Sequence, residues 1–534
     1  MDRKEEQRLE QLSPFEVKNT LIKLAKSSRH HAMINAGRGN PNWVATTPRE
    51  AFFLLGQFAL EESQRSEYVG AGFGGICDRE GVESRFATYL SKHDSDGGRF
   101  LLSALGICVS RLGLKADDVL VEWVDGILGD NYPVPDRILA CTEAIVAAYL
   151  RQEMAAGDVP PPEGEFDYFA VEGGTAAMVY LMNSLKTNGF LRAGDRIAMG
   201  VPIFTPYIEL PELEDYQLES VDLEADEMNG WQMPESELEK LRDPSIRAFF
   251  LVNPSNPPSV SLSDDSLRKI AEIASERGDL LLVTDDVYGT FTDGFTSLAT
   301  VAPHQTLLVY SYSKYFGATG WRLGVIGLHQ DNIFDRLLQE QDASSKERLR
   351  KRYQGISLDP DKLRFIDRIV ADSRAVALNH TAGLSTPQQI QMSLFSLFSL
   401  SDWGAGYKQE AKRIVRSRYK ALYERLEAKP LVSLDDPNGA FYYSEIDIRI
   451  IATRRHGEEF FEWMKENFEP LDFIIRLAQE SAIVVMPGAG FDAPDWSLRV
   501  SLANLYTAQY LELSEGIEAM LQEYYDAYRA ATGK

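Results

Sequence analysis

Cysteine is scarce in this chain of 534 residues, which contains only Cys77, Cys108 and Cys141. The three are widely spaced and form no CxxC pair, so the sequence predicts neither a disulfide framework nor a cysteine zinc site. This usage is typical of a reducing cytoplasm. The seven histidines are scattered without metal-ligand spacing, and we expect no metal centre.

Long apolar runs and excess positive charge are also missing. No apolar run reaches about 18 residues, so no membrane-spanning helix is expected. The polar first residues lack the apolar core of a secretory signal. The chain has 55 Lys and Arg against 80 Asp and Glu, a net charge of −25. This acidic balance disfavours nucleic acids and anionic membranes as partners, although a local basic pocket can still bind a small anion.

Short apolar runs alternate with helical patterns between about residues 165 and 330. Several runs are apolar nearly throughout and end at Gly, Pro, Asn or Asp. This pattern is typical of strands buried on both faces of a mostly parallel sheet. We therefore predict an α/β protein in three parts. These are an N-terminal segment with a helical extension (1–150), a large domain with a helical insertion at 331–378 (151–400), and a smaller α/β domain (401–534).

Polar and aromatic residues gather where these predicted strands end, at the edge where open α/β sheets bind ligands. Gly173, Gly174 and Thr175 come just before a helix, where backbone N–H groups bind phosphate well. Phe204 and Tyr207 offer ring faces for stacking. The other candidates at strand ends are Asn256, Asp285, Tyr288, Ser311, Ser313, Lys314 and Arg322, and Arg499 lies far downstream.

One ligand would use this whole set of groups. Pyridoxal 5′-phosphate (PLP) has a phosphate, a flat ring, a ring nitrogen that works best protonated, a phenolic oxygen and an aldehyde. We expect Lys314 to be its Schiff-base partner and the catalytic base. Asp285 would keep the ring nitrogen protonated. The remaining expected contacts are Asn256 and Tyr288 at the phenolic oxygen, Ser311, Ser313, Arg322 and Gly173–Thr175 near the phosphate, and Arg499 at a substrate α-carboxylate.

The order GGT…PxF…NPxNP…DxxY…SxSKxxxxxGxR…R resembles the aspartate aminotransferase family of fold-type I PLP enzymes over about residues 165–505. The block SYSKYFGATGWR is its most specific part. One departure is NPPS, where many members have NPTG; it affects the turn and leaves Asn256 in place. The resemblance implies a large domain with a mostly parallel seven-stranded sheet flanked by helices, and a smaller α/β domain.

Three further features bear on the reaction. The segment NAGRGNPNW (35–43) resembles the family's N-terminal substrate loop and contains Arg38 and Gly39. The segment STPQQIQ (385–391) lacks the arginine with which aspartate aminotransferases bind a distal carboxylate. Arg38, aided by Lys18, is therefore the candidate for a second substrate carboxylate. The chain is also longer than the family usually is, with extra blocks at about 80–130 and 331–378.

These features together resemble the aspartate 4-decarboxylases, a bifunctional branch of that family. The resemblance implies conversion of L-aspartate to L-alanine and CO2, side aminotransferase activity, and activation by an α-keto acid. It implies that Tyr132 reaches the cofactor phosphate of a neighbouring subunit, and that the chain forms a homo-oligomer built from dimers, up to a dodecamer.

Two alternatives remain for the residues themselves. A plain aminotransferase acting on aspartate or another amino acid would use the same motifs. A non-enzymatic regulator on this fold would carry a basic DNA-binding helix, and the first 150 residues show none.

Overall fold

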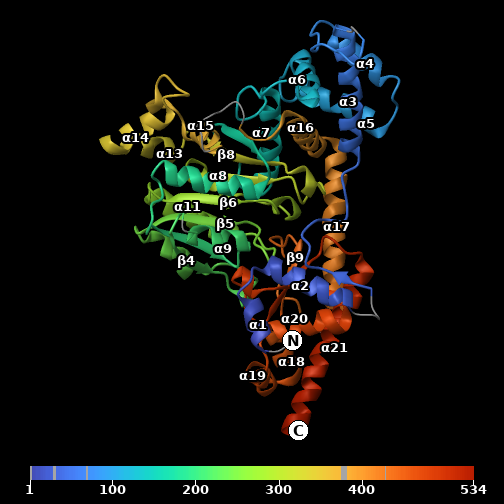
Figure 1. Ribbon diagram of the computed structural model, residues 1–534, viewed down its shortest axis with the longest axis vertical. Helices are drawn as coiled ribbons and strands as arrows, with labels where there is room; N and C mark the ends of the chain where they lie inside the picture. Colours follow the sequence, from blue (N-terminus) through green and yellow to red (C-terminus); the bar gives the residue numbers. More distant parts are fainter. Residues whose placement is uncertain are drawn as a thin grey trace.

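The computed structural model describes residues 3–27, 32–67, 70–213, 215–374, 382–426 and 428–533. The molecule is elongated (Figure 1), with a helical extension at one end, a large sheet in the middle and a lobe carrying the C-terminus at the other end. The long helix α17 (Asp402–Arg425) runs lengthwise beside the large sheet and reaches that lobe. No helix in the described ranges is both long and apolar enough to cross a membrane.

The large domain contains a seven-stranded sheet in the order β2-β8-β7-β6-β5-β3-β4. Strand β8 is antiparallel to both of its neighbours, whereas the other neighbouring pairs are parallel. The prediction of a mostly parallel seven-stranded sheet is therefore confirmed. The strands are β2 (Phe166–Val171), β3 (Arg196–Val201), β4 (Glu219–Glu224), β5 (Ile246–Val252), β6 (Leu281–Asp285), β7 (Thr306–Ser311) and β8 (Gly324–His329).

Most of these strands are apolar because both faces of the sheet are covered. In β5, Phe249 and Leu251 belong to one hydrophobic cluster, while Phe250 and Val252 belong to another. Alternate side chains of a strand point to opposite faces, so each face has its own core. Strand β4 is the exception. It lies at the edge of the sheet, most of its residues are exposed or partly exposed, and its sequence ESVDLE contains no apolar run, so the sequence analysis did not predict it.

Helices pack around this sheet as the alternating pattern predicts. The helices are α7 (Ala140–Met154), α8 (Gly174–Thr187), α9 (Thr205–Glu212), α10 (Glu235–Leu238), α11 (Asp264–Glu276), α12 (Leu298–Val301), α13 (Ile333–Glu340), α14 (Ala343–Tyr353), α15 (Phe365–Asp372) and α16 (Thr386–Leu400). Within the described part of the block after residue 331, the helices α13, α14 and α15 are separated by connecting segments, and α15 ends at Asp372; residues 375–378 of the predicted insertion lie outside the described ranges.

The lobe with the C-terminus combines residues from both ends of the chain. Its antiparallel sheet has the order β11-β12-β9, and the short β1 (Ile34–Asn35) pairs in parallel with β10 (Ile483–Val484). The N-terminal helix α2 packs against α20. The other elements are α1 (Arg3–Glu10), α2 (Pro14–Ser27), β9 (Tyr443–Asp447), α18 (Ile448–His456), α19 (Glu458–Asn467), α20 (Pro470–Ser481), β11 (Met486–Pro487), β12 (Ser497–Ser501) and α21 (Thr507–Thr532).

The helical extension consists of α3 (Thr47–Ser66), α4 (Val82–Leu90), α5 (Asp96–Ser110) and α6 (Ala116–Leu128). Three of these helices, α3, α5 and α6, pack against α16 of the large domain. The first 150 residues therefore divide between two places. One part joins the C-terminal lobe, and the other forms the projecting end of the molecule (Figure 1).

Candidate active site

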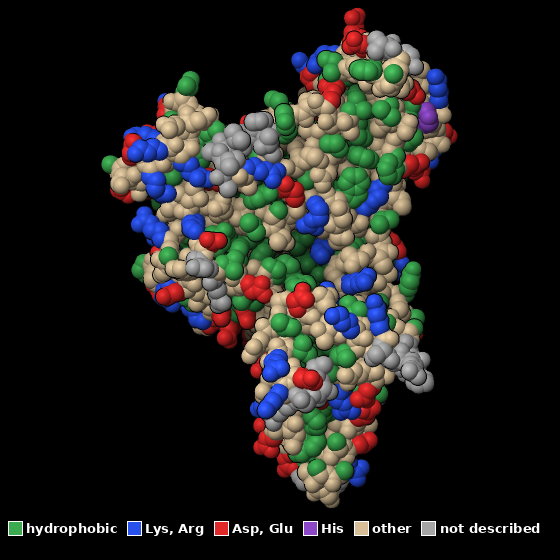
Figure 2. All heavy atoms as spheres, viewed as in Figure 1, with side chains coloured by type: hydrophobic (Ala, Val, Ile, Leu, Met, Phe, Trp, Pro, Cys, Tyr) green, Lys and Arg blue, Asp and Glu red, His purple; other side chains and the backbone are tan. Residues whose placement is uncertain are grey.

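A cavity of about 240 Å³ lies at the carboxyl ends of the central strands, where the large domain meets the C-terminal lobe. Figure 2 shows the surface hollowed between these two parts, with basic side chains inside the hollow. Most of the residues predicted from the sequence line this cavity: Gly39, Gly174, Thr175, Phe204, Tyr207, Asn256, Asp285, Tyr288, Ser311, Ser313, Lys314, Arg322 and Arg499.

One end of the cavity brings together Arg322, Ser311 and the start of helix α8. Arg322 adopts a left-handed backbone (φ +56°), and its guanidinium donates to the carbonyl oxygens of Thr319 and Glu172 at 3.0 and 3.2 Å. A Cβ on Gly173 would lie 2.3 Å from Arg322 Nη2, so only glycine admits the guanidinium here. The buried Ser311 hydroxyl donates to Ser313 Oγ at 2.9 Å. Helix α8 begins beside these groups, which adds the partial positive charge of a helix N-terminus.

Asp285, at the end of β6, is the buried carboxylate of the cavity. It accepts hydrogen bonds from the Tyr207 hydroxyl at 2.5 Å and from Val287 N at 3.2 Å. Burial raises the pKa of Asp285 from 3.8 to about 6, against the lowering effect of the Tyr207 hydrogen bond. A carboxylate held in this way strongly favours a positively charged neighbour, such as a protonated ring nitrogen.

Two polar groups face the cavity from the neighbouring strand ends. Asn256 is 1 % exposed, and its side-chain Oδ1 has no hydrogen-bond partner among the described residues. Tyr288 is also buried, and its hydroxyl donates to Tyr443 Oη at 3.2 Å. A buried amide oxygen without a partner costs free energy, so this position favours a ligand that carries a donor.

Lys314 projects into the cavity from the turn after β7. Its Nζ donates to the carbonyl oxygen of Gly39 at 3.1 Å. The Tyr442 hydroxyl donates to the same oxygen at 2.8 Å, which fixes the substrate-loop segment against the lysine. A Cβ on Gly39 would lie 3.1 Å from Nζ and 2.6 Å from Tyr443 Oη, so this glycine allows the loop to approach the amine closely.

Arg499 reaches the cavity from β12 and is 2 % exposed. Its guanidinium lies over the rings of Tyr443 and Phe491, with Cζ 4.5 and 4.8 Å from the ring centroids. Nη2 donates to the carbonyl oxygen of Gly37 at 3.1 Å, while the buried Nε has no partner among the described residues. A buried guanidinium without a carboxylate partner is a site for an anionic ligand.

Lys18 and Arg38 lie near Arg499 but do not line the cavity. Burial, followed by the charges of Arg499 and Arg38, lowers the pKa of Lys18. The Arg38 side chain is exposed. Three cations therefore cluster at this end of the site, where repulsion between them favours a bound anion. The specific role predicted for Lys18 and Arg38 stays a prediction.

Tyr132 does not line the cavity of its own chain. It is 62 % exposed on the loop between α6 and α7. Its predicted role at the phosphate of a neighbouring subunit concerns a second chain and stays a prediction.

The structure adds residues to the site that the sequence analysis missed. Tyr443 lines the cavity, and although burial opposes ionisation, the positive charges of Lys314 and Arg499 outweigh it and lower the pKa of its hydroxyl. Phe15 in α2 also lines it and meets Phe204 edge-to-face, with ring centroids 5.9 Å apart. Both come from the C-terminal lobe, and neither lies in a motif of the large domain. The aromatic run FYY (441–443), which leads into β9 at Tyr443, was the only signal for this residue.

Comparisons with known proteins place these features in context. Residues 169–517 match the model for "Aminotransferase class I and II". The chain is 51% identical over 525 residues to the "Bifunctional aspartate aminotransferase and L-aspartate beta-decarboxylase" of Pseudomonas sp, with 98% of each chain covered. Among solved structures, a double mutant of Thermus thermophilus aspartate aminotransferase is similar with a TM-score of 0.59 and 17% identity, covering 97% of this chain and 98% of that one. The structure of Pyrococcus protein-A1 has a TM-score of 0.61 and 18% identity over the same shares.

Proposed function

Because the chain belongs to the class I and II aminotransferase family, we propose that it is a PLP-dependent L-aspartate 4-decarboxylase with side aspartate aminotransferase activity. It converts L-aspartate to L-alanine and CO2. The observation that carries this proposal is the 51% identity, over 98% of both chains, to the bifunctional relative from Pseudomonas. The likeness extends through the extra N-terminal block as well as the large domain.

The residues of the cavity fit PLP. Arg322, Ser311 and the amides before α8 suit its phosphate. Asp285 suits the ring nitrogen, and the unpartnered Asn256 lies at the neighbouring strand end, where the phenolic oxygen would need a hydrogen-bond donor. Since Asn and Gln side-chain amides present an oxygen and an NH2 group that can exchange places by rotation, Asn256 can meet either need. Phe204 and Tyr207 also line the cavity and would contact the ring.

When bound, PLP supplies an aldehyde that bonds to amino groups and a protonated ring that withdraws electrons from the substrate carbon. The chain supplies the proton transfers. The Lys314 amine lies free of any carboxylate partner in the described structure, with the Gly39 carbonyl as its acceptor, so it can take the α-proton and return it. Because Asp285 is buried, solvent screens its negative charge little, and its electrostatic interaction with an adjacent positive group is strong.

The cations at the end of the cavity formed by the C-terminal lobe would orient the substrate by binding its two carboxylates. Arg499 is buried and holds one face toward the cavity, which suits the α-carboxylate. Arg38 and Lys18 would hold the β-carboxylate. Arg38 is exposed and Lys18 is only half-buried. Their ion pairs with the β-carboxylate would therefore be weaker than a bidentate pair with a buried arginine. A weakly paired carboxylate leaves more readily as CO2.

The assembly we propose is a homo-oligomer built from dimers, in which Tyr132 completes the site of the neighbouring subunit. The exposed position of Tyr132 is consistent with a contact outside its own chain. The three cysteines are free and buried, which is consistent with a cytoplasmic enzyme.

The test measures CO2 and alanine from L-aspartate with purified protein and PLP, with α-keto acid at no more than a catalytic amount. Equal amounts of alanine and CO2 over many turnovers are expected, since an α-keto acid is needed only to reverse the side transamination. Turnover that requires stoichiometric 2-oxoglutarate, with oxaloacetate accumulating, would identify a plain aminotransferase instead.

A further inference from the structure

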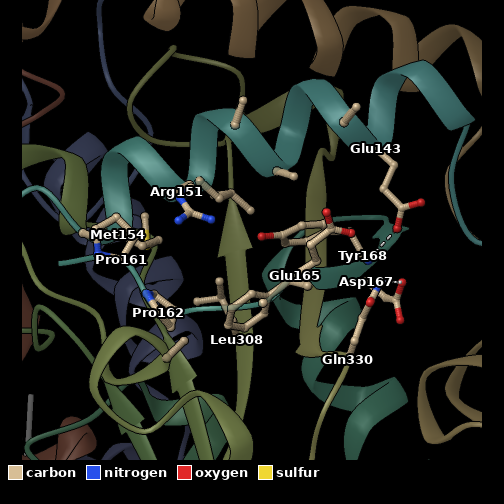
Figure 3. Close-up of a pocket in the computed structure, with 18 of the residues that line it drawn as sticks. Glu143, Arg151, Met154, Pro161, Pro162, Glu165, Asp167, Tyr168, Leu308 and Gln330 are labelled. Carbon is tan, nitrogen blue, oxygen red and sulfur yellow. Dashed lines mark hydrogen bonds between the residues drawn. The ribbon is translucent and has the colours of Figure 1, made fainter. Parts of the chain in front are cut away.

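A second cavity of about 440 Å³ lies between α7 and the large sheet, and it shares no lining residue with the active site. Its walls are one face of α7, the segment before β2, and the floor formed by β2, β7 and α12. Figure 3 shows α7 crossing above this space, with Tyr168 and Leu308 below it.

Small residues on the α7 wall leave this cavity open. Helix α7 presents Ala144, Ala147 and Ala148 to the sheet, and short side chains cannot fill the gap between a helix and a sheet. On the floor, Gly327 of β8 lies in register between Tyr168 and Leu308. A Cβ on Gly327 would lie 2.9 Å from Tyr168 Cε1, so glycine lets the tyrosine ring lie across β8.

Two hydrogen-bonding groups point into this space. Arg151 descends from α7, and Tyr168 extends from β2 toward the same region (Figure 3). Tyr168 is 4 % exposed, yet its hydroxyl forms no hydrogen bond within the described ranges. The Arg151 guanidinium likewise has no carboxylate partner there. Arg151 and Tyr168 line the same cavity from opposite walls, α7 and β2, so one ligand in this space faces both groups.

The other charges around the cavity are already paired or negative. Arg137 donates to Glu143 and to Asp167, with Nη2 3.0 and 3.1 Å from their carboxylate oxygens. Asp167 also pairs with Arg364 at 2.5 Å. Among the described residues that line the cavity, Arg151 is therefore the cation without a carboxylate partner, and its side chain is exposed. The carboxylates of Glu143, Glu165 and Asp167 line the rest of the cavity and would repel a second negative charge.

We propose that this cavity is a binding site for a small monocarboxylate with an apolar body. The Arg151 guanidinium and the Tyr168 hydroxyl donate to the carboxylate. The apolar body lies among the alanines of α7, Met154 and Leu308. This arrangement, a concave apolar space with a few convergent polar groups, is the usual form of a small-molecule site. Because Leu308 and Ser311 share strand β7, an occupant contacts the strand that carries the active-site serine.

Hexanoate is a suitable probe, with succinate and hexan-1-ol as comparison compounds of similar size. Binding to the holoenzyme is measured by saturation-transfer NMR and titration calorimetry. We expect saturable hexanoate binding, and much weaker binding of succinate, which carries a second negative charge, and of hexan-1-ol, which lacks the carboxylate. Arg151→Gln should weaken hexanoate binding about tenfold or more, the effect of losing a charge-assisted hydrogen bond. Ala147→Leu, which fills the space, should weaken it as well.

The active site also binds carboxylates, so Arg499→Gln is the matched control. Hexanoate binding should be unchanged within about twofold in this variant. Should the control variant fail to fold, saturating succinate in the native holoenzyme serves the same purpose, and hexanoate binding should persist. No saturable binding, equal binding to Arg151→Gln, or loss of binding with Arg499→Gln would each overturn the proposal.

Discussion

Gly173 lies beside Arg322 at the end of the cavity that we propose holds the PLP phosphate, and Gly173→Ala tests whether the absence of a side chain is required there. Gly173 has φ +89° and ψ 175°, a region that only glycine adopts readily, and an alanine there costs about 1–3 kcal/mol. Its Cβ would also lie 2.3 Å from Arg322 Nη2, so the guanidinium must move. Losing one charge-assisted hydrogen bond to a phosphate costs about 1.5–3 kcal/mol. The dissociation constant for PLP should therefore rise roughly 10- to 150-fold.

The assay follows absorbance or fluorescence as apoprotein is titrated with PLP, alongside thermal melting of the apoprotein. Gly194→Ala is the matched control, because Gly194 has a similar φ of +84° but no atom within 4 Å of its added Cβ. That variant should melt at a lower temperature and still bind PLP normally. If Gly173→Ala binds PLP within twofold of the native protein, the assignment of Arg322 and this turn to the phosphate is wrong.

Three further outcomes are expected. Lys314→Ala should abolish both alanine formation and aminotransferase turnover, since one amine serves both; residual turnover of either kind, measured by coupled assay, would contradict a shared base. Arg38→Ala should reduce aspartate turnover far more than alanine transamination, and equal losses in the two kcat/KM values would remove Arg38 from the β-carboxylate. Burial raises the pKa of Asp285 to about 6, so the folded apoprotein binds a proton more tightly than the unfolded chain does. The ionised carboxylate therefore destabilises the apoprotein above about pH 6, and this cost disappears as pH falls toward 4. Asp285→Asn apoprotein should consequently melt at a higher temperature than the native apoprotein at pH 8, with the difference shrinking below pH 6, while its affinity for PLP falls; a pH-independent difference would contradict the assigned cause.

The large domain was predictable because its strands are buried on both faces. Continuous apolar runs ending at Gly, Pro, Asn or Asp indicated the strands of a mostly parallel sheet and placed Lys314 at the end of one of them. The edge strand β4 has one covered face at most, so its polar sequence ESVDLE carried no such signal. Site residues could be predicted from the residue types alone where they follow directly after one strand.

Residues brought in from the other lobe were harder to predict. Tyr443 and Phe15 enter the cavity through packing between segments that are distant in the chain, and no local pattern marks either one. Arg38 and Lys18 were chosen from a family resemblance, and the fold brings them near Arg499 without placing them in the cavity wall. The cavity beside Arg151 could not be predicted from the sequence, because alanines are common in helices and do not indicate an unfilled space.

The contact between Arg499 and the Gly37 carbonyl has a consequence for how the protein is made. The two residues are 462 positions apart in the chain, and β1 pairs with β10 over a similar span. During synthesis at roughly 5–20 residues per second, the N-terminal segment waits about 25–90 s before its partners emerge. The large-domain sheet can assemble during that interval, but the wall formed by Gly39 and Arg499 cannot. A nascent chain therefore carries Lys314 long before it carries a closed active site. A chain that ends prematurely between Lys314 and β12 would have the amine without Arg499, the residue proposed to bind the substrate.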